Sequence, residues 1–468
     1  MIDNYPPEFK TLIADLLGSD ASRFWKALLK PARQGMRINP SKTSLNEIRE
    51  ALPGEYHPLP WTRNGYQLEG VQEAGKHPFH AAGLFYLQEP SAMAPVPVLD
   101  PQPGEKVLDL CAAPGGKTTQ IQSQMGDKGL LISNDPNPNR VQALARNLER
   151  WGGRNSVVLS ETAERLYEHF GSYFDRVLVD APCSGEGTFR SDPGEIKKWS
   201  PAFSERTRFI QDEILWFAGK LVRPGGTLVY STCTFNGHEN EEAVANFLET
   251  NQNFQLASIP KQVGFSPGIQ PNNRENLDFS KTVRIWPHTS CGEGHFIARM
   301  TKGSAQGDDA VSLPSSQSTD SEARQIYRDF FDQTLSQTAN TRLIFPDNPG
   351  IHHYGNRLYW ISDGAPDLTG LRVIHWGWWL GTINDRNFVP GPTLASTLST
   401  GDVKKVLELP LDDPRLDIYR RGSPVPLSEQ EAGADGWMLI TAAGHPLGWG
   451  KLRHGRLKSY FPRWLRSI

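Results

Sequence analysis

Alternating strand and helix signals between residues 96 and 300 constrain the fold of this chain more than any other feature. Short apolar runs typical of buried strands recur there, and amphipathic stretches typical of helices separate them. This order favours an α/β protein whose helices cover both faces of a mostly parallel sheet. The expected strands are Lys106–Leu110, Leu130–Asn134, Ser156–Leu159, Arg176–Asp180, Thr227–Thr232, Val283–Trp286 and Phe296–Met300, and the main expected helices are Pro138–Trp151, Ser204–Leu221 and His238–Thr250. The last two strands follow each other through a short glycine-rich turn, which predicts that they form an antiparallel pair at one edge of the sheet.

Further modules are expected on both sides of this core, because 468 residues are too many for one hydrophobic core. Residues 1–95 begin with two amphipathic stretches, Glu8–Leu17 and Ala21–Leu29, and predict an N-terminal α+β segment. Residues 303–322 are small and polar and predict a linker, since they cannot bury enough apolar surface to become ordered. Beyond it, tryptophan-rich runs separated by turns predict one or two small β-rich modules, with a break near residue 390.

Composition excludes several classes of protein. No apolar stretch reaches the roughly 18 residues of a transmembrane helix, and the first residues lack the pattern of a secretion signal. The four cysteines are too few for a disulfide framework, and their spacing fits no zinc site. We therefore expect a cytoplasmic protein with reduced thiols, no bound metal and no membrane association.

The charge is close to neutral overall but unevenly distributed. A net charge of −3 argues against a wholly basic surface that coats nucleic acid. Residues 450–468 nevertheless contain no acidic residue, and Tyr460, Phe461 and Trp464 lie among their basic residues. Basic residues interleaved with aromatic ones favour contact with RNA, and the alternative is a solvated C-terminal tail. The basic residues are Lys451, Arg453, Arg456, Lys458, Arg463 and Arg466.

Two cysteines come just after expected strands. Cys183 lies in Asp180-Ala-Pro-Cys-Ser-Gly-Glu-Gly and Cys233 in Ser231-Thr-Cys-Thr. If these strands are parallel neighbours, both thiols open into the crevice at the carboxyl edge of the sheet, where α/β proteins bind ligands. Two thiols in one pocket indicate covalent catalysis assisted by a second cysteine. Two buried core cysteines are the alternative, which Asp180, Pro182 and the strand-end positions disfavour; proximity alone does not tell which thiol attacks.

A glycine pair between the first strand and its helix predicts a cofactor loop, Cys111-Ala-Ala-Pro-Gly-Gly-Lys117. Glycines there let the backbone approach a ligand at a helix N-terminus. A phosphate loop would need a glycine where Cys111 stands, and no G-x-G-x-x-G is present, so ATPase and dehydrogenase sites are disfavoured. Asp135, about 20 residues further on, is placed to hold a ribose. A ribose site without a polyphosphate site favours S-adenosylmethionine; a plain strand–turn–helix junction is the alternative.

With these residues identified, the chain resembles the RNA (cytosine-C5) methyltransferases of the Nop/Sun family, RsmF type. The segments that carry the resemblance are the cofactor loop, the Asp180 motif, the Ser231 motif and His80–Met93, and they cover roughly residues 1–300. The segment Gly448–Lys458 is similar, more loosely, to the end of a PUA-like RNA-binding module.

The resemblance implies a class I, Rossmann-like methyltransferase core with a mostly parallel seven-stranded sheet at residues 96–300. An N-terminal RNA-binding segment at 1–95, a ferredoxin-like module at 323–390 and a PUA-like RNA-binding module at 391–468 would flank it. The implied activity is methyl transfer from S-adenosylmethionine to C5 of a cytosine in small-subunit (16S) ribosomal RNA, by a monomer. A transfer RNA substrate and a non-catalytic RNA-binding factor in ribosome assembly are the alternatives.

The resemblance also implies roles for individual residues. Cys233 would be the nucleophile that adds to C6 of cytosine, and Cys183 would help in proton removal and release. Asp180, if protonated, would donate to N3 of the base, and Lys117 would reach the same edge; a helix-surface lysine is the alternative for Lys117. The implied cofactor-binding residues are Cys111, Ala112, Ala113, Pro114, Gly115, Gly116, Lys117, Asp135, Arg140, Thr162 and Asp180. Thr162 stands where the family usually has an acidic residue for the adenine amine, and Glu161 or a backbone carbonyl is the expected substitute.

Overall fold

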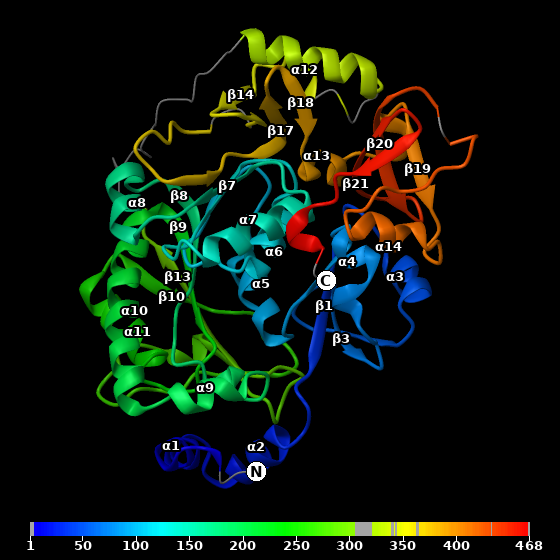
Figure 1. Cartoon of the computed structure of the whole chain (residues 1–468). Coiled ribbons are helices and arrows are strands. Elements are labelled where there is room, and N and C mark those ends of the chain that lie inside the picture. The colour runs from blue at the N-terminus through cyan, green and yellow to red at the C-terminus, as the bar shows by residue number, and fades with distance from the viewer. Residues whose placement is uncertain are drawn as a thin grey trace.

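The computed structural model describes residues 4–304, 321–337, 341, 344–361, 365–431 and 433–466 (Figure 1). Except at its two ends, the expected linker at 303–322 lies outside these residues. A large α/β core occupies the left and centre of Figure 1, an N-terminal sheet lies to its right, and the C-terminal modules lie above both.

The central sheet confirms the predicted α/β fold and is larger than expected. The seven expected strands form its middle: β5 (Lys106–Asp109), β6 (Leu130–Asn134), β7 (Ser156–Leu159), β8 (Phe174–Asp180), β9 (Val222–Thr232), β12 (Val283–Ile285) and β13 (His295–Lys302). Three short strands, β10 (Phe254–Ala257), β11 (Phe265–Pro267) and β16 (Val373–His375), extend it to ten, in the order β11-β12-β13-β9-β8-β5-β6-β7-β16 with β10 on β13. The strands from β7 to β9 are parallel, and those beyond them are antiparallel.

Helices cover both faces of this sheet, because its central strands are apolar on both sides. One face packs against α8 (Ala163–Phe170), α10 (Pro201–Leu221) and α11 (Glu241–Thr250). The other packs against α5 (Pro95–Leu99), α6 (Gly116–Met125) and α7 (Arg140–Trp151). Helix α10 begins three residues before the predicted start, because the Ser200 hydroxyl accepts a hydrogen bond from the Phe203 N–H and Pro201 occupies the first turn.

The N-terminal segment has two parts. Helices α1 (Pro7–Leu17) and α2 (Ala21–Leu28) match the two predicted amphipathic stretches and project from the bottom of the molecule in Figure 1. The second part is a four-stranded antiparallel sheet in the order β2-β3-β1-β4 with two short helices. Its elements are β1 (Gln34–Ile38), α3 (Leu45–Ala51), β2 (Glu55–Pro58), β3 (Gly65–Glu69), α4 (Pro78–Ala81) and β4 (Phe85–Leu87).

The first C-terminal module differs from the prediction. Its elements are α12 (Ser321–Thr334), β14 (Ile351–Tyr354), β15 (Arg357–Trp360), β17 (Trp378–Asn384), β18 (Asn387–Pro390) and α13 (Pro392–Thr397). The four strands pair in chain order and are all antiparallel, so the ferredoxin-like topology expected for 323–390 is wrong. A ferredoxin-like fold needs two helical crossovers between strands. Between β15 and β17 the chain instead forms β16, which leaves the module and pairs with β7 of the core.

The second C-terminal module is a four-stranded sheet in the order β19-β20-β21-β22. Its elements are β19 (Val406–Leu409), α14 (Arg415–Arg420), β20 (Gly436–Ala442), β21 (His445–Arg453) and β22 (Arg456–Ser459). The module shares one hydrophobic core with the N-terminal sheet. A solvated C-terminal tail is therefore wrong, since Leu452, Leu457 and Phe461 are buried in that core.

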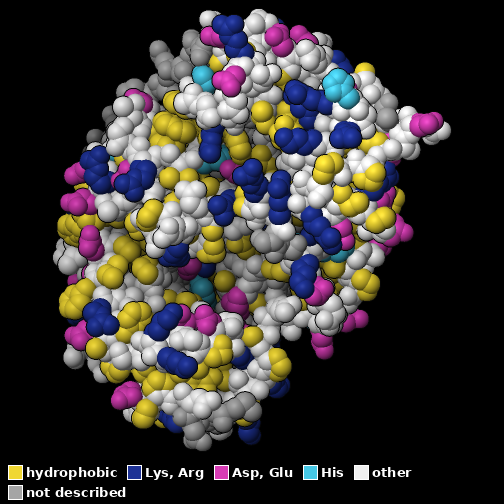
Figure 2. All heavy atoms as spheres, in the orientation of Figure 1, with side chains coloured by type: hydrophobic (Ala, Val, Ile, Leu, Met, Phe, Trp, Pro, Cys, Tyr) yellow, Lys and Arg dark blue, Asp and Glu magenta, His cyan; other side chains and the backbone are white. Residues whose placement is uncertain are grey.

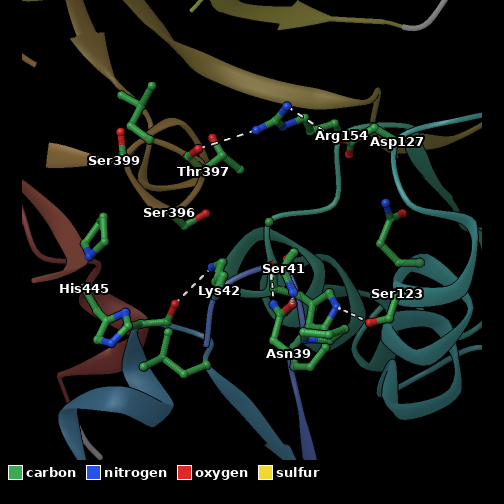
Figure 3. A pocket seen from close by; sticks show the side chains of 18 of the residues that line it. Asn39, Ser41, Lys42, Ser123, Asp127, Arg154, Ser396, Thr397, Ser399 and His445 are labelled. Carbon is green, nitrogen blue, oxygen red and sulfur yellow. Dashed lines mark hydrogen bonds and ion pairs between the residues drawn. The ribbon is translucent and has the colours of Figure 1, made fainter. Parts of the chain in front are cut away.

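The N-terminal segment, the core and the C-terminal modules meet around a cavity of about 450 Å³ (Figure 3). Lys42 donates to the Ala82 and Arg150 carbonyls at 3.0 and 2.9 Å, and burial lowers its pKa to about 7. Arg154 pairs with Asp127 at 3.2 Å. Lys42 thus ties the N-terminal segment to the core, and Arg154 ties the C-terminal part to it by donating to the Thr397 carbonyl of α13 at 3.5 Å. Among the described residues, no helix is both long and apolar enough to cross a membrane.

Candidate active site

The expected site residues gather at the carboxyl edge of the sheet, where β5, β8 and β9 end side by side. Asp109 pairs in register with Leu178, and Asp180 pairs with Ser231. Because the three strands are parallel, the loops that follow them converge. These loops carry the cofactor motif, Cys183 and Cys233, as the sequence predicted.

The two thiols are in contact. The Sγ atoms of Cys183 and Cys233 lie 3.2 Å apart, and the Cys233 N–H donates to the Cys183 Sγ at 3.4 Å. The hydrogen bond with Cys233, burial, and the charges of Cys233 and Glu239 raise the pKa of Cys183 well above its usual range. Cys183 therefore keeps its proton.

A buried carboxylate network lies behind the thiols and was not predicted. Glu239 accepts from the Ser184 N–H at 3.0 Å, from the Ser204 hydroxyl at 2.6 Å and from the Gln211 amide at 2.8 Å. Burial, and then the charge of Glu239, raises the pKa of Glu186 to about 7. Ser184 and Glu186 follow Cys183, and Glu239 follows Cys233, so the network joins the two thiol loops.

Lys117 and Asp180 form an ion pair beside the thiols. The Lys117 Nζ donates to the Asp180 Oδ2 at 2.7 Å, and the Ser231 hydroxyl donates to Oδ1 at 2.8 Å. Burial alone would raise the pKa of Asp180, but Lys117 and then His295 outweigh it and hold that pKa well below its usual range. A protonated Asp180 is therefore wrong for the free protein. A surface position for Lys117 is wrong too, because this residue is 8% exposed.

The glycine pair forms the predicted turn at the start of α6. Gly115 has a φ of 107°, in the left-handed region that favours glycine, and a Cβ on Gly116 would lie 3.2 Å from the Gln88 side chain. From the N-terminal sheet, the buried guanidinium of Arg37 donates to the Gly116 carbonyl at 2.9 Å and to the Thr119 hydroxyl at 2.5 Å. The N-terminal segment thus supports the cofactor loop directly.

A cavity of about 220 Å³ opens beside this loop. The predicted cofactor residues that line it are Cys111, Ala112, Ala113, Pro114, Gly116, Lys117 and Asp180, and Gly115 forms the turn behind them. Backbone at a helix N-terminus, a carboxylate and an ammonium suit the amino-acid part of S-adenosylmethionine.

The three other predicted cofactor residues lie outside this lining. Asp135 is buried, with its Oδ2 3.3 Å from the Ala113 N–H and 3.6 Å from a guanidinium nitrogen of Arg140. Thr162 caps α8 by accepting from the Arg165 N–H at 3.2 Å. Glu161, the expected substitute for an adenine ligand, accepts instead from the Arg372 N–H at 2.6 Å.

Two further residues of the site were missed by the sequence analysis. Asp109 lines the cavity and is fully buried, and burial raises its pKa to about 7. An acidic residue inside an apolar strand was the signal for it. His295 is also buried, and its Nε2 lies 3.5 Å from the Asp180 Oδ1. Among the described residues, no group of His, Cys, Asp and Glu could hold a metal ion.

The fold and site define a class I methyltransferase that uses S-adenosylmethionine. Four family models match the chain: 16S rRNA methyltransferase RsmB/F at residues 96–301, the N-terminal domain of 16S rRNA methyltransferase RsmF at 5–90, the RsmF first C-terminal domain at 330–398 and the RsmF PUA domain at 406–467. The chain belongs to the RsmF family of RNA methyltransferases.

Curated relatives and solved structures agree with this assignment. Ribosomal RNA small subunit methyltransferase F of Shigella boydii serotype 18 is 32% identical, over 98% of this chain and 96% of that protein. The protein of the same name from Shewanella loihica is 29% identical, over 93% and 89%. A methyltransferase homologue from Pyrococcus horikoshii superposes with a TM-score of 0.56 at 30% identity, covering 64% of this chain and 95% of that one.

Proposed function

We propose that this enzyme transfers a methyl group to C5 of a cytosine in small-subunit ribosomal RNA through a covalent adduct between Cys233 and C6 of the base. The contact of 3.2 Å between the Cys183 and Cys233 thiols, next to the Asp180–Lys117 pair, carries the proposal. The names of the relatives support ribosomal RNA of the small subunit as the substrate.

C5 of cytosine is a weak nucleophile, and addition of a thiolate at C6 activates it. S-adenosylmethionine supplies the methyl group as an electrophile. We assign the addition to Cys233, whose sulfur lies 3.2 Å from the protonated thiol of Cys183. After transfer, a base has to remove the proton from C5 so that Cys233 can leave. Cys183 lies close enough to Cys233 to assist this release and to protonate the departing sulfur.

Addition at C6 places negative charge on N3 of the ring, which then needs a proton or a hydrogen-bond donor. Lys117 carries donors at the edge of the cavity, and Asp180 lies between Lys117 and Ser231. The target base has to leave its stack to reach these groups.

The C-terminal hairpin supports binding to the RNA backbone. Lys451 pairs in register with Lys458, and Arg453 with Arg456, so like charges stand directly opposite each other on β21 and β22. Such pairs destabilise a hairpin unless an anion lies across them. Figure 2 shows Lys and Arg side chains gathered over the region of β20 and β21. Tyr460, Phe461 and Trp464 pack against hydrophobic cores, so the proposed contact is with phosphates.

We assign RNA binding to this module and to residues 1–95, and propose that the enzyme works as a monomer in the cytoplasm, where its substrate and reduced thiols occur together.

The adduct can be tested with RNA that contains 5-fluorocytidine, because fluorine at C5 blocks the final proton loss. Wild-type enzyme with cofactor should form a covalent complex, Cys233→Ala should form none, and Cys183→Ala should accumulate a complex on ordinary RNA. Cys291→Ala is the matched control with an unchanged adduct. An adduct that survives Cys233→Ala would disprove the nucleophile assignment.

The alternatives are distinguished by bisulfite sequencing of RNA from a deletion strain. Loss of one or more 5-methylcytosines from 16S RNA supports the proposal, and loss only from transfer RNA supports the transfer RNA alternative. Methylation unchanged in both would favour a non-catalytic assembly factor.

A further inference from the structure

His295 is a buried histidine in the active site that the steps above leave without a role. It is 4% exposed, and neither ring nitrogen has a hydrogen-bond partner among the described residues. Its Nε2 lies 3.5 Å from the Asp180 Oδ1. Burial of a polar ring costs free energy, and the Asp180 carboxylate is the charged group that lies close enough to compensate for it.

The sheet places His295 on the same face as the other site residues. In β13, Ile297 pairs with Ser231, and Ser231 pairs in turn with Asp180. Residues two apart on a strand share a face, so His295 lies on the face of Ile297, Ser231 and Asp180. This is the face covered by α5 and α6, and α6 carries Lys117.

Asp180 stands between His295 and the cavity. Its side chain is 31% exposed and lines the cavity, and its Oδ1 is the atom nearest to the histidine. The other charged or titratable groups around His295 are Lys117 on α6, the Cys183 and Cys233 thiols at the ends of β8 and β9, and two carboxylates near the start of β13. Of these carboxylates, Glu293 pairs with Arg190, and Glu89 accepts from the Glu293 N–H.

We infer that His295 is a positioning residue that supplies, through Asp180, the proton that N3 of cytosine takes up when Cys233 adds to C6. The inference rests on the proposed function. It deepens that proposal by naming the source of the proton, since Asp180 itself is held ionised.

The transfer conserves protons and charge. When the Cys233 thiolate forms its bond to C6, N3 gains one proton from Asp180, and His295 passes its Nε2 proton to the Asp180 Oδ1. Asp180 is again a carboxylate and His295 is neutral. When Cys233 leaves, N3 returns the proton to Asp180, and Asp180 returns it to His295.

Two variants separate proton supply from support of Asp180. His295→Gln keeps an N–H donor of similar reach but cannot titrate, and His295→Phe removes both properties. Both should lower kcat by about 10² or more, the usual size of general acid catalysis, with the KM for RNA unchanged. Wild-type kcat should fall as the pH rises and His295 loses its proton; this alkaline limb should be absent from both variants. His375→Gln is the matched control: His375 is also buried, its ring nitrogens have no hydrogen-bond partner in the described part of the chain, and it lies outside the site.

Full kcat and an intact alkaline limb in His295→Gln would overturn the inference and leave a hydrogen-bonding role. Cofactor binding by calorimetry shows whether each variant is folded. In the wild-type enzyme, the ¹⁵N signals of the His295 ring, assigned by their absence in His295→Gln, should report a protonated imidazole at the pH of maximal activity. A neutral ring there would overturn the inference without reliance on a variant.

Formation of the 5-fluorocytidine adduct separates the inference from the proposed function. If wild type forms no 5-fluorocytidine adduct, the proposed function fails. If wild type and His295→Gln form the adduct equally fast, only the inference fails.

Discussion

Glu239 accepts a hydrogen bond of 3.0 Å from the backbone N–H of Ser184, and this contact joins the loop of Cys233 to the loop of Cys183. Both residues are buried, so the distance between the thiols depends on a carboxylate that touches neither of them directly. The active site is therefore built from two loops that are held together from behind.

Glu239→Ala is expected to destabilise the core and separate the thiols. It leaves the N–H of Ser184, the hydroxyl of Ser204 and the amide of Gln211 buried without this acceptor, and each such group costs about 1–3 kcal/mol. Relief of repulsion with Glu186 offsets part of this, so we expect a net loss of about 3 kcal/mol by urea denaturation. Glu242→Ala, an exposed neighbour, is the control. Equal stability of the two variants would contradict the role of the network.

Lys117→Met is expected to reduce activity and to change the pH dependence of stability. In the wild type, the pKa of Asp180 is lower in the folded protein than in the unfolded chain, so the pair stabilises the fold above the unfolded pKa of about 4, and this stability is lost as the pH falls further. Without Lys117, only His295 opposes the effect of burial, so the pKa of Asp180 rises, and the weaker compensation of its charge should cost about 2 kcal/mol at pH 7.

That cost should shrink as the pH falls below 7 and Asp180 takes up a proton. Chemical denaturation of both proteins across this range measures it, and Lys220→Met is the control for loss of a lysine outside the site. A cost that does not vary with pH would exclude a charged Asp180 as its source.

The parallel part of the sheet could be predicted because each strand is a local apolar run that ends in a turn. The meeting of Cys183 and Cys233 was predicted on the condition that their strands are parallel neighbours, and β8 and β9 meet this condition. Strand β16 lies in one of the tryptophan-rich strand-like runs, but its pairing with the central sheet could not be predicted in the same way. It is three residues long, and its partner β7 lies in another part of the sequence, so no local pattern specifies the pairing.

His295 shows a second limit of sequence patterns. At the start of an antiparallel strand it carries no local signal, and its position beside Asp180 arises from the register of β13 on β9 and of β9 on β8. The buried carboxylate network behind the thiols could not be predicted for the same reason. Glu186 and Glu239 are 53 residues apart, and only folding makes them neighbours. The sequence therefore did not predict the polar groups of the site that only the fold brings together.

Replacement of three exposed residues of the basic hairpin, Arg453, Arg456 and Lys458, by Gln should weaken RNA binding without unfolding the module. Each lost phosphate contact should lower the slope of log affinity against log salt by about one unit. Removal of the opposed like charges should leave stability unchanged or raise it slightly. Fluorescence anisotropy with 16S RNA fragments over a salt series measures the slope, with Lys261→Gln as the control. An unchanged slope would exclude the hairpin from the RNA interface.

Phe24→Ala tests whether the N-terminal helices support catalysis. Phe24 is fully buried, and its ring lies 5.2 Å from that of Phe235, two residues after Cys233. On α1, Phe9 contacts Phe189 of the Cys183 loop at 5.2 Å. A buried Phe→Ala change costs about 3–5 kcal/mol.

Because α1 and α2 project from the core, this loss should loosen the helices and thiol loops rather than unfold the sheet (Figure 1). We therefore expect kcat to fall while the affinity for S-adenosylmethionine stays constant, since the cofactor loop is held by Arg37 from a different element. Leu29→Ala, an exposed residue after α2, is the control. A parallel loss of cofactor affinity in Phe24→Ala would show that the helices stabilise the whole core instead.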